Sequence, residues 1–388
     1  MISPQSPVPS PQPLSRKRSG KLGRRRGLGA LVGTAALLAA AAPASAQGQG
    51  EPNDFYGVIP IEQMQENEFE KLGNARIGIL RLPVIWRQIE PAPDSYDWGA
   101  LDYYVGNAAR VGVEVLPFPY TSPQWAVSGC QGEIKCQNVP PIGSAEAREA
   151  WQDFLRDLIA RYGPSGEFWA ANPDIPALPI TTYQIWNEPS SPTYWKNPNA
   201  GRYAELVKLS ADTIRAEVPQ ARILLAGLFG TPQGKDAAKN VVWKFLGRLY
   251  KTQGIEDYFD AVALHPYAPD IEGLDTQLRK ARQKMQRAGD SGAEIVVTEI
   301  GWGSAMPHGD RPLIKGKKGQ KRLLNQSYRF LNRNRGKYNI GGIIWYAWRD
   351  PGYDVEGCEF CGSAGLFKEK GSAKPAWDAL LKFTGGSG

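Results

Sequence analysis

Two glutamates in this chain follow short runs of β-branched residues, at points where strands are expected to end. Glu188 lies two residues past the run 180–186, and Glu299 is the last residue of the run 294–299. Two carboxyl groups about 5 Å apart can cleave a glycosidic bond with retention, because one protonates the leaving oxygen while the other attacks the anomeric carbon. The pair therefore indicates glycoside chemistry, provided that the surrounding elements bring both carboxyl groups to one place.

The elements that would position this pair alternate regularly along the chain. Eight short apolar runs predict strands that are buried on both faces of a parallel sheet, and amphipathic stretches between them predict helices. Eight such strand–helix units predict a single (β/α)8 barrel, in which Glu188 and Glu299 would share the rim at the carboxyl ends of the strands. The predicted strands are 54–59, 77–82, 112–118, 180–186, 222–227, 260–265, 294–299 and 340–346, and the clearest predicted helices are 144–162, 200–218 and 376–383.

A doubly wound open sheet is the alternative architecture. That fold usually has fewer strands and a glycine-rich first turn, and the sequence has no such turn. Two segments that follow predicted strands are long: 119–143 after the third strand and 348–374 after the eighth. Barrel enzymes build their sites from loops at this end, so these two loops are expected to border the site.

All four cysteines lie in these two long loops. Cys130 and Cys136 are in the first, and Cys358 and Cys361 are in the second. In an exported chain four cysteines favour two disulfides, and we expect the two local pairings rather than cross-pairing. A zinc site with four thiolates is a further alternative, although the spacing of the first pair is wide for a zinc knuckle.

The sequence around the two glutamates resembles clan A of the retaining glycoside hydrolases. The matching segments are Trp186-Asn187-Glu188-Pro189 on the fourth predicted strand and Thr298-Glu299-Ile300-Gly301-Trp302 on the seventh. The resemblance implies that Glu188 is the acid/base, that Glu299 is the nucleophile, and that Asn187 binds the 2-hydroxyl of the sugar. It extends over nearly the whole chain after the leader.

Within that clan, family 39 is the most similar, on the segments 86–91, 96–98 and 122–126 together with the motif at Glu188. Xylosidases and iduronidases of this family usually carry an accessory β-sandwich domain, whereas this sequence ends with the last predicted barrel helix. The chain is more similar to the compact members that cut bacterial exopolysaccharides internally. Family 5 is the second most similar family, because its nucleophile motif differs from the segment Thr298–Trp302 of this chain.

Four further positions match the clan: Arg81, His265, Tyr267 and, at the end of the eighth predicted strand, Trp348. The first three have polar side chains with a physical role in the site. Arg81 would hold Glu299 ionised through a charge-assisted hydrogen bond, or would form a structural salt bridge inside the barrel. Tyr267 could donate a hydrogen bond to the nucleophile. His265 could bind a sugar hydroxyl or a neighbouring carboxylate, although a lone histidine is more often a structural residue. Only His308 accompanies it in the chain, which is too little histidine for a histidine-based metal site, and this chemistry needs no cofactor.

Aromatic residues supply flat surfaces on which apolar sugar faces pack. Trp125, Trp302 and Trp348 each follow a predicted strand end, so we expect them to bind the carbohydrate substrate. Other aromatic candidates are Trp86, Tyr120, Tyr194, Trp195 and Trp345, whereas Trp151, Trp243 and Trp377 have helical spacing and are expected in the core.

The first 46 residues predict a secretory signal peptide, so residues 47–388 are expected to form the catalytic domain. Basic residues precede a short Gly/Ala-rich apolar run that ends in Ala44-Ser45-Ala46, too short to favour a membrane anchor. This segment carries seven basic and no acidic residues, which accounts for the whole formal net charge of +7. We therefore expect a secreted protein that does not bind nucleic acid, is not an integral membrane protein and is monomeric.

One later segment is strongly basic: residues 311–337 contain ten Lys and Arg and no acidic residue. The first part of this segment follows the seventh strand, so it could attract an anionic polysaccharide, or it could be a solvated helix. The sequence as a whole predicts a secreted retaining β-glycosidase. A sugar-binding barrel without catalysis and a transglycosylase with the same site are the alternatives.

Overall fold

A computed structural model describes residues 53–230, 242–307, 311–355 and 357–388. The predicted signal peptide and His308 lie outside the described residues. The parallel strands are β1 (Asn53–Ile59), β2 (Ile77–Ile85), β3 (Glu114–Tyr120), β4 (Thr182–Ile185), β5 (Arg222–Leu225), β6 (Leu228–Phe229), β7 (Ala261–His265), β8 (Glu294–Ile300) and β9 (Ile340–Tyr346).

All eight predicted strands are present, and the two-residue β6 is an addition. The strands pair in the order β3-β2-β1-β9-β8-β7-β5-β4, and β6 pairs with β7 beside this path. The two ends of the path, β3 and β4, lie side by side. The sheet therefore forms a nearly closed barrel, and the prediction of a single (β/α)8 barrel is confirmed.

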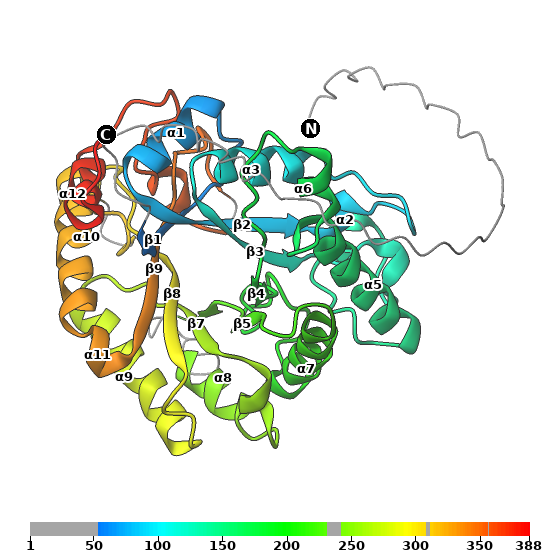
Figure 1. Ribbon diagram of the computed structural model, residues 1–388. Coiled ribbons are helices and arrows are strands. Elements are labelled where there is room, and N and C mark those ends of the chain that lie inside the picture. Colours follow the sequence, from blue (N-terminus) through cyan, green and yellow to red (C-terminus); the bar gives the residue numbers. More distant parts are fainter. Residues whose placement is uncertain (1–52, 231–241, 308–310, 356) are drawn as a thin grey trace, which may run out of the picture. The chain divides into compact units, whose positions relative to one another are not determined.

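Helices surround this sheet on the outside (Figure 1). They are α1 (Glu66–Asn74), α2 (Trp86–Ile89), α3 (Gly99–Arg110), α4 (Glu133–Cys136), α5 (Ala145–Tyr162), α6 (Glu167–Ala171), α7 (Ala200–Glu217), α8 (Val242–Leu249), α9 (Ile271–Arg287), α10 (Gly316–Arg333), α11 (Arg335–Tyr338) and α12 (Pro375–Thr384). Short 3-10 turns lie at η1 (Gln124–Ala126), η2 (Ile255–Tyr258) and η3 (Cys361–Ser363). No helix in the described ranges is both long and apolar enough to cross a membrane.

Local sequence signals explain where the long helices begin. Ser144, Asn199 and Asp270 cap α5, α7 and α9, and each side chain accepts a hydrogen bond from a backbone N–H in the first turn. Such caps satisfy donors that the helix cannot satisfy itself. The helices that follow β3, β4 and β7 therefore begin at defined residues, which fixes the lengths of the loops before them.

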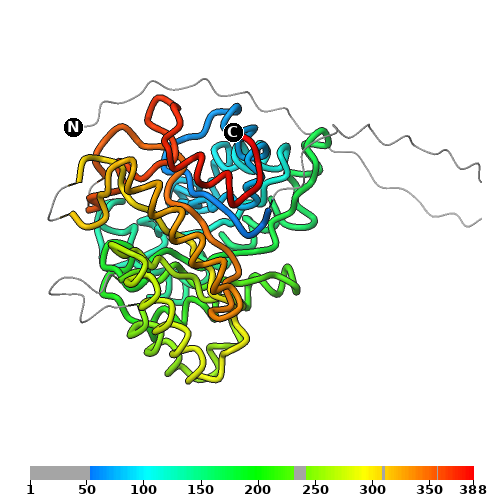
Figure 2. The backbone as a smooth tube through the Cα atoms, turned by 90° about the vertical axis from the view of Figure 1, so that its left-hand side faces the viewer, coloured from blue at the N-terminus to red at the C-terminus, as the bar shows by residue number. Residues whose placement is uncertain are grey.

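The two long loops predicted at the site are confirmed. The loop after β3 runs to α5 and contains η1 and α4, and the loop after β9 runs to α12 and contains η3. The C-terminal segment then returns to the first strand–helix unit, where the Ser387 N–H donates to the Asn74 carbonyl at 2.8 Å. Figure 2 shows this last segment, in red, beside the blue start of the barrel.

Candidate active site

A sharp turn after β4 carries Glu188 to the rim of the barrel. Trp186 and Glu188 have φ values of 71° and 39°, in the left-handed region that bulky residues rarely adopt. The buried Trp186 side chain holds the turn, because its indole N–H donates to the Tyr194 carbonyl at 2.8 Å. The turn points the Glu188 side chain, which is 11% exposed, inward toward β8.

Glu299 lies near the end of β8 and faces Glu188. Its carboxylate accepts hydrogen bonds from Arg81 Nη1 at 2.6 Å and from the Tyr267 hydroxyl at 2.8 Å. One oxygen of Glu188, one oxygen of Glu299 and a ring nitrogen of His265 all lie within 4.8 Å of one another. The structure thus brings together the two glutamates that the sequence singled out.

Arg81 on β2 connects the strands that carry the carboxyl groups. Besides Glu299, its guanidinium donates to Gln184 Oε1 at 2.7 Å and to Asn187 Oδ1 at 2.8 Å, and it lies 3.8 Å from the centre of the Phe118 ring. With its oxygen accepting from Arg81, Asn187 has its NH2 group left to donate to a ligand. Arg81 therefore orients both the carboxylate and the amide at the rim.

His265 lies between the two carboxyl groups at the end of β7. Its Nδ1 is 2.7 Å from Glu188 Oε1, and its Nε2 is 3.4 Å from Glu299 Oε1 without forming a hydrogen bond. The ring fits because residue 227 is glycine: a Cβ there would lie 1.8 Å from His265 Nε2. The sequence left open whether His265 binds a sugar hydroxyl or a neighbouring carboxylate, and in the structure it contacts a carboxylate.

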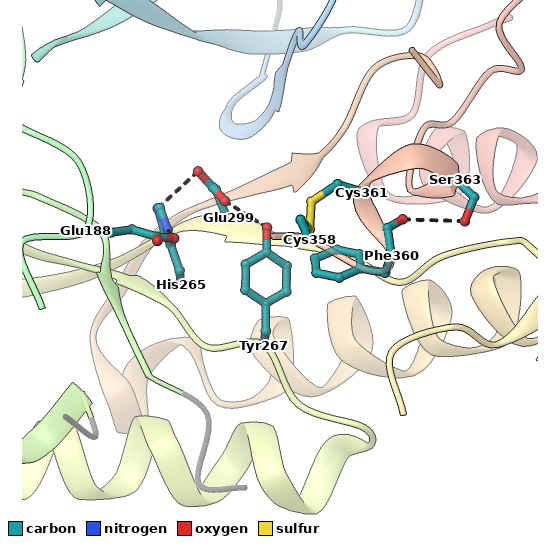
Figure 3. Close-up of a disulfide and its surroundings, with 8 residues drawn as sticks. All are labelled: Glu188, His265, Tyr267, Glu299, Cys358, Phe360, Cys361 and Ser363. Carbon is teal, nitrogen blue, oxygen red and sulfur yellow. Dashed lines mark hydrogen bonds and ion pairs between the residues drawn. A yellow bond between two sulfur atoms is a disulfide. The ribbon is translucent and has the colours of Figure 1, made fainter. Parts of the chain in front are cut away.

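Tyr267 connects Glu299 to the long loop after β9. Its ring centre is 4.9 Å from that of Phe360, and both residues belong to one buried cluster with Cys361. Figure 3 shows the disulfide, Phe360, Tyr267 and Glu299 in a row. The loop thus packs against the residue that donates to the carboxylate.

The environments of the two carboxyl groups differ. Burial raises the pKa of Glu188 well above its ordinary value, the negative charge of Glu299 raises it further, and Arg81 lowers it. Burial also raises the pKa of Glu299, but Arg81 and the Tyr267 hydrogen bond oppose this rise. Burial and the charge of Arg81 lower the pKa of His265 well below its ordinary value, so its ring is neutral at neutral pH. Glu188 is therefore the better proton donor and Glu299 the better anion.

Three tyrosines line the site at the same rim. Burial raises the pKa of all three hydroxyls; the charges of Glu188 and Glu299 raise it further at Tyr194 and Tyr346, and Glu299 adds to it at Tyr120. All three rings are partly exposed. Tyr120 and Tyr194 were among the wider aromatic candidates, whereas Tyr346 was missed. Its position at the end of the eighth predicted strand is the signal that could have found it.

Two of the three tryptophans expected to bind sugar are in fact buried. Trp302 and Trp348 are each 1% exposed, and their indole N–H groups donate to the Ala268 carbonyl and to Glu68 Oε1. Rings enclosed in this way offer no face to a ligand, so the expectation of sugar platforms was wrong for both.

The third tryptophan, Trp125, is partly exposed. Its N–H donates to the Glu90 carbonyl at 3.0 Å, and its ring packs edge-on against Trp86. The described contacts do not bring Trp125 to the carboxyl groups.

The cysteines form the two local disulfides, Cys130–Cys136 and Cys358–Cys361. Glu188, His265 and Glu299 have a spacing that could hold a metal ion. However, the Arg81 guanidinium already pairs with Glu299, and a cation placed here would meet that fixed positive charge. The donor set thus suits proton transfer and nucleophilic attack better than metal binding.

The fold belongs with those of glycoside hydrolase barrels, as comparison with solved structures indicates. The chain is similar to a family 39 glycoside hydrolase from the gut symbiont Bacteroides cellulosilyticus WH2, with 20% identity over 86% of this chain and 64% of that one, and a TM-score of 0.60. It is also similar to a monomeric β-xylosidase from Caulobacter crescentus CB15, with 17% identity over 88% and 70% of the two chains and a TM-score of 0.62.

A shorter solved structure is similar over almost its full length. An endo-β-1,4-glucanase from Xanthomonas axonopodis pv. citri shares 13% identity over 86% of this chain and 99% of its own, with a TM-score of 0.56. No protein-family model and no curated protein matches the sequence. The similarity therefore lies in the fold, which is like that of family 39 enzymes in clan A, as the motifs implied.

Proposed function

We propose that this protein is a retaining β-glycosidase that hydrolyses O-glycosidic bonds of an oligo- or polysaccharide. The observation that carries the proposal is the approach of the two carboxyl groups, whose nearest oxygens lie within 4.8 Å. Retaining enzymes place their carboxyl groups about 5–5.5 Å apart, whereas inverting enzymes need about 6.5–9.5 Å to admit a water molecule. This close approach supports retention rather than inversion.

Glu299 is assigned as the nucleophile. Its hydrogen bonds from Arg81 and Tyr267 stabilise the ionised form that attack requires. Glu188 is assigned as the acid/base, because its raised pKa keeps a proton available near neutral pH. Asn187 presents its NH2 group beside both, where it can bind a hydroxyl of the sugar.

In the first step Glu188 donates its proton to the glycosidic oxygen while a Glu299 oxygen bonds to the anomeric carbon and the leaving sugar departs. In the second step Glu188, now ionised, takes a proton from water as the water oxygen replaces Glu299 at that carbon. The Glu299 charge disappears when the covalent intermediate forms, so the pKa of Glu188 falls at the moment when it must act as a base.

The protein is further proposed to act outside the cell as a monomer whose catalytic domain is 47–388. The two disulfides support an oxidising compartment. A transglycosylase would use the same intermediate, with a sugar in place of water. A binding barrel without catalysis is disfavoured, because the carboxyl pair and the groups that tune it are all in place.

Replacement of the two carboxyl groups tests the proposal. Glu188→Gln should lower the rate of hydrolysis by about 10²–10⁴, and Glu299→Gln should lower it at least as much. The panel should include β-xylosides and β-1,4-glucans, the substrates of similar folds. Proton NMR of the first product should give the same anomer as the substrate; an inverted anomer, or full activity in both variants, would contradict the proposal.

A further inference from the structure

A small cavity opens between the loops that follow β2, β3 and β4, and two tyrosines of the site, Tyr120 and Tyr194, line it. Its volume is about 110 Å³. At roughly 30 Å³ per water molecule, it holds a few waters or one substituted edge of a sugar ring, but not a whole sugar chain. Its walls include Arg87, Tyr120, Thr121, Gln137, Thr193 and Tyr194.

Aromatic contacts connect this cavity to the catalytic carboxylates. The Arg81 guanidinium, which binds Glu299, lies on the Phe118 ring, and that ring stacks on Tyr120 with 5.4 Å between their centres. Tyr120 in turn lies 6.1 Å from Tyr194. The wall of the cavity is therefore connected to the Arg81–Glu299 pair through Phe118 and Tyr120.

Two residues that line the cavity each have a buried polar atom without a hydrogen-bond partner. Thr121 is 5% exposed, and its hydroxyl oxygen makes no hydrogen bond; the same is true of the buried Nε of Arg87. Within the part of the chain that the structure describes, no carboxylate pairs with the half-buried Arg87 guanidinium. Buried polar groups are normally satisfied, so these unpaired atoms show that the polar contacts of Arg87 and Thr121 are incomplete in the protein alone.

A larger hollow with two lysines in its lining is formed by two of the same loops. The hollow has a volume of about 860 Å³, and its lining includes Lys135, Lys196 and Asn138 but no acidic residue. The same two loops form both spaces, since Gln137 precedes Asn138 and Tyr194 lies two residues before Lys196. The residues lining both spaces thus include cations and no carboxylate, which favours an anionic ligand.

We propose that the cavity beside Arg87 binds an anionic group, a carboxylate in the first instance, on a sugar unit adjacent to the cleaved bond. The inference rests on the proposed glycosidase function and narrows its substrate to acidic oligo- or polysaccharides. The planar guanidinium suits a bidentate contact with a carboxylate, and Thr121 supplies a further hydroxyl donor. This set of cations is distinct from the basic segment 311–337.

Binding without turnover provides the test. β-Linked oligosaccharides from glucuronoxylan, mannuronate-rich alginate and hyaluronan are compared with the same oligosaccharides after chemical reduction of their carboxyl groups to alcohols. Calorimetry with the Glu299→Gln variant should show at least one acidic oligosaccharide that binds about tenfold or more tightly than its reduced form. Higher salt should shrink this preference.

Adding Arg87→Gln should abolish the preference, and Arg87→Lys should retain part of it. Two control variants remove the same charge elsewhere: Lys318→Gln in the basic segment and Lys251→Gln, which is exposed after α8. Both should leave the preference intact. Thermal unfolding confirms that each variant is folded. Equal binding of acidic and reduced forms, no binding of any acidic form, or an unchanged preference in Arg87→Gln would overturn the inference. If Glu188→Gln still abolished hydrolysis in that case, the glycosidase function would stand and only the acidic specificity would fall.

Discussion

Glu188 carries a cost for stability that its catalytic role requires. Its pKa is raised in the folded protein by burial and by Glu299, so the folded state binds this proton more tightly than the unfolded chain does. Stability from this group is thus fully present below the ordinary glutamate pKa and is lost as the pH rises through the folded value. Glu188→Gln should therefore stabilise the protein at neutral pH by roughly 0.5–2 kcal/mol.

Thermal unfolding from pH 4 to pH 8 measures this effect. The melting temperature of Glu188→Gln should exceed that of the unaltered protein at pH 8, and the gap should narrow toward pH 4, where both forms are uncharged. Glu149→Gln, an exposed site on α5, is the matched control and should show no such trend. A gap that grows as the pH falls would reverse the sign of the argument.

At the scale of single residues, the sequence predicted the polar side chains of the site better than the aromatic ones. Asn187 and Tyr267 lie beside the carboxyl groups because each comes two residues after the end of a strand, whereas Arg81 reaches them from within β2. Trp348 was misplaced because the chain beyond a strand end can turn either way, and this ring turned into the core. The sequence also could not show which residues of β9 point into the barrel and which point outward. A strand that is buried on both faces has no alternation of polar and apolar residues.

At the scale of elements, the loop after β9 acts as a brace for the nucleophile. Phe360 packs on Tyr267, which donates to Glu299, and the Cys358–Cys361 disulfide lies directly beside Phe360 (Figure 3). Phe360→Ala should let Tyr267 move, and small displacements near reacting groups can cost up to about 10² in rate. We expect a fall in kcat that is larger than the change in KM.

The brace is tested with a small aryl β-glycoside, which does not depend on distant sugar contacts. Phe360→Leu should recover part of the lost kcat because it refills the space, and a double Cys358→Ser, Cys361→Ser variant should show a milder loss. Glu359→Gln, exposed in the same loop, is the matched control. If Phe360→Ala changed the melting temperature but not kcat, the loop would be structural only.

The element pattern itself was largely readable from the sequence. All eight predicted strands formed because their continuous apolar runs can be buried only in a sheet covered on both faces. The short β6 was missed, since two residues carry no periodicity. The positive φ values at Trp186 and Glu188 could not be foreseen either, because they arise from tertiary contacts such as the indole bond to Tyr194.

At the scale of the whole molecule, the barrel closes through contacts between distant parts of the chain. β1 pairs with both β2 and β9, and the C-terminal segment binds back to α1 through Ser387. Units joined in this way cannot unfold singly without exposing the shared core. A shortened chain that begins at Gln47 should therefore unfold in one cooperative transition and keep the hydrolytic activity of the secreted form.

Calorimetry and N-terminal sequencing of the secreted protein test this together. One transition, with calorimetric and van't Hoff enthalpies that agree, is expected for a single domain. Cleavage after Ala46 should remove seven basic residues and leave a formal charge of zero, so the secreted protein should focus well below the pI of about 9.1 that the full sequence gives. Two separated transitions, or a secreted form that keeps the basic leader, would contradict the proposed domain of residues 47–388.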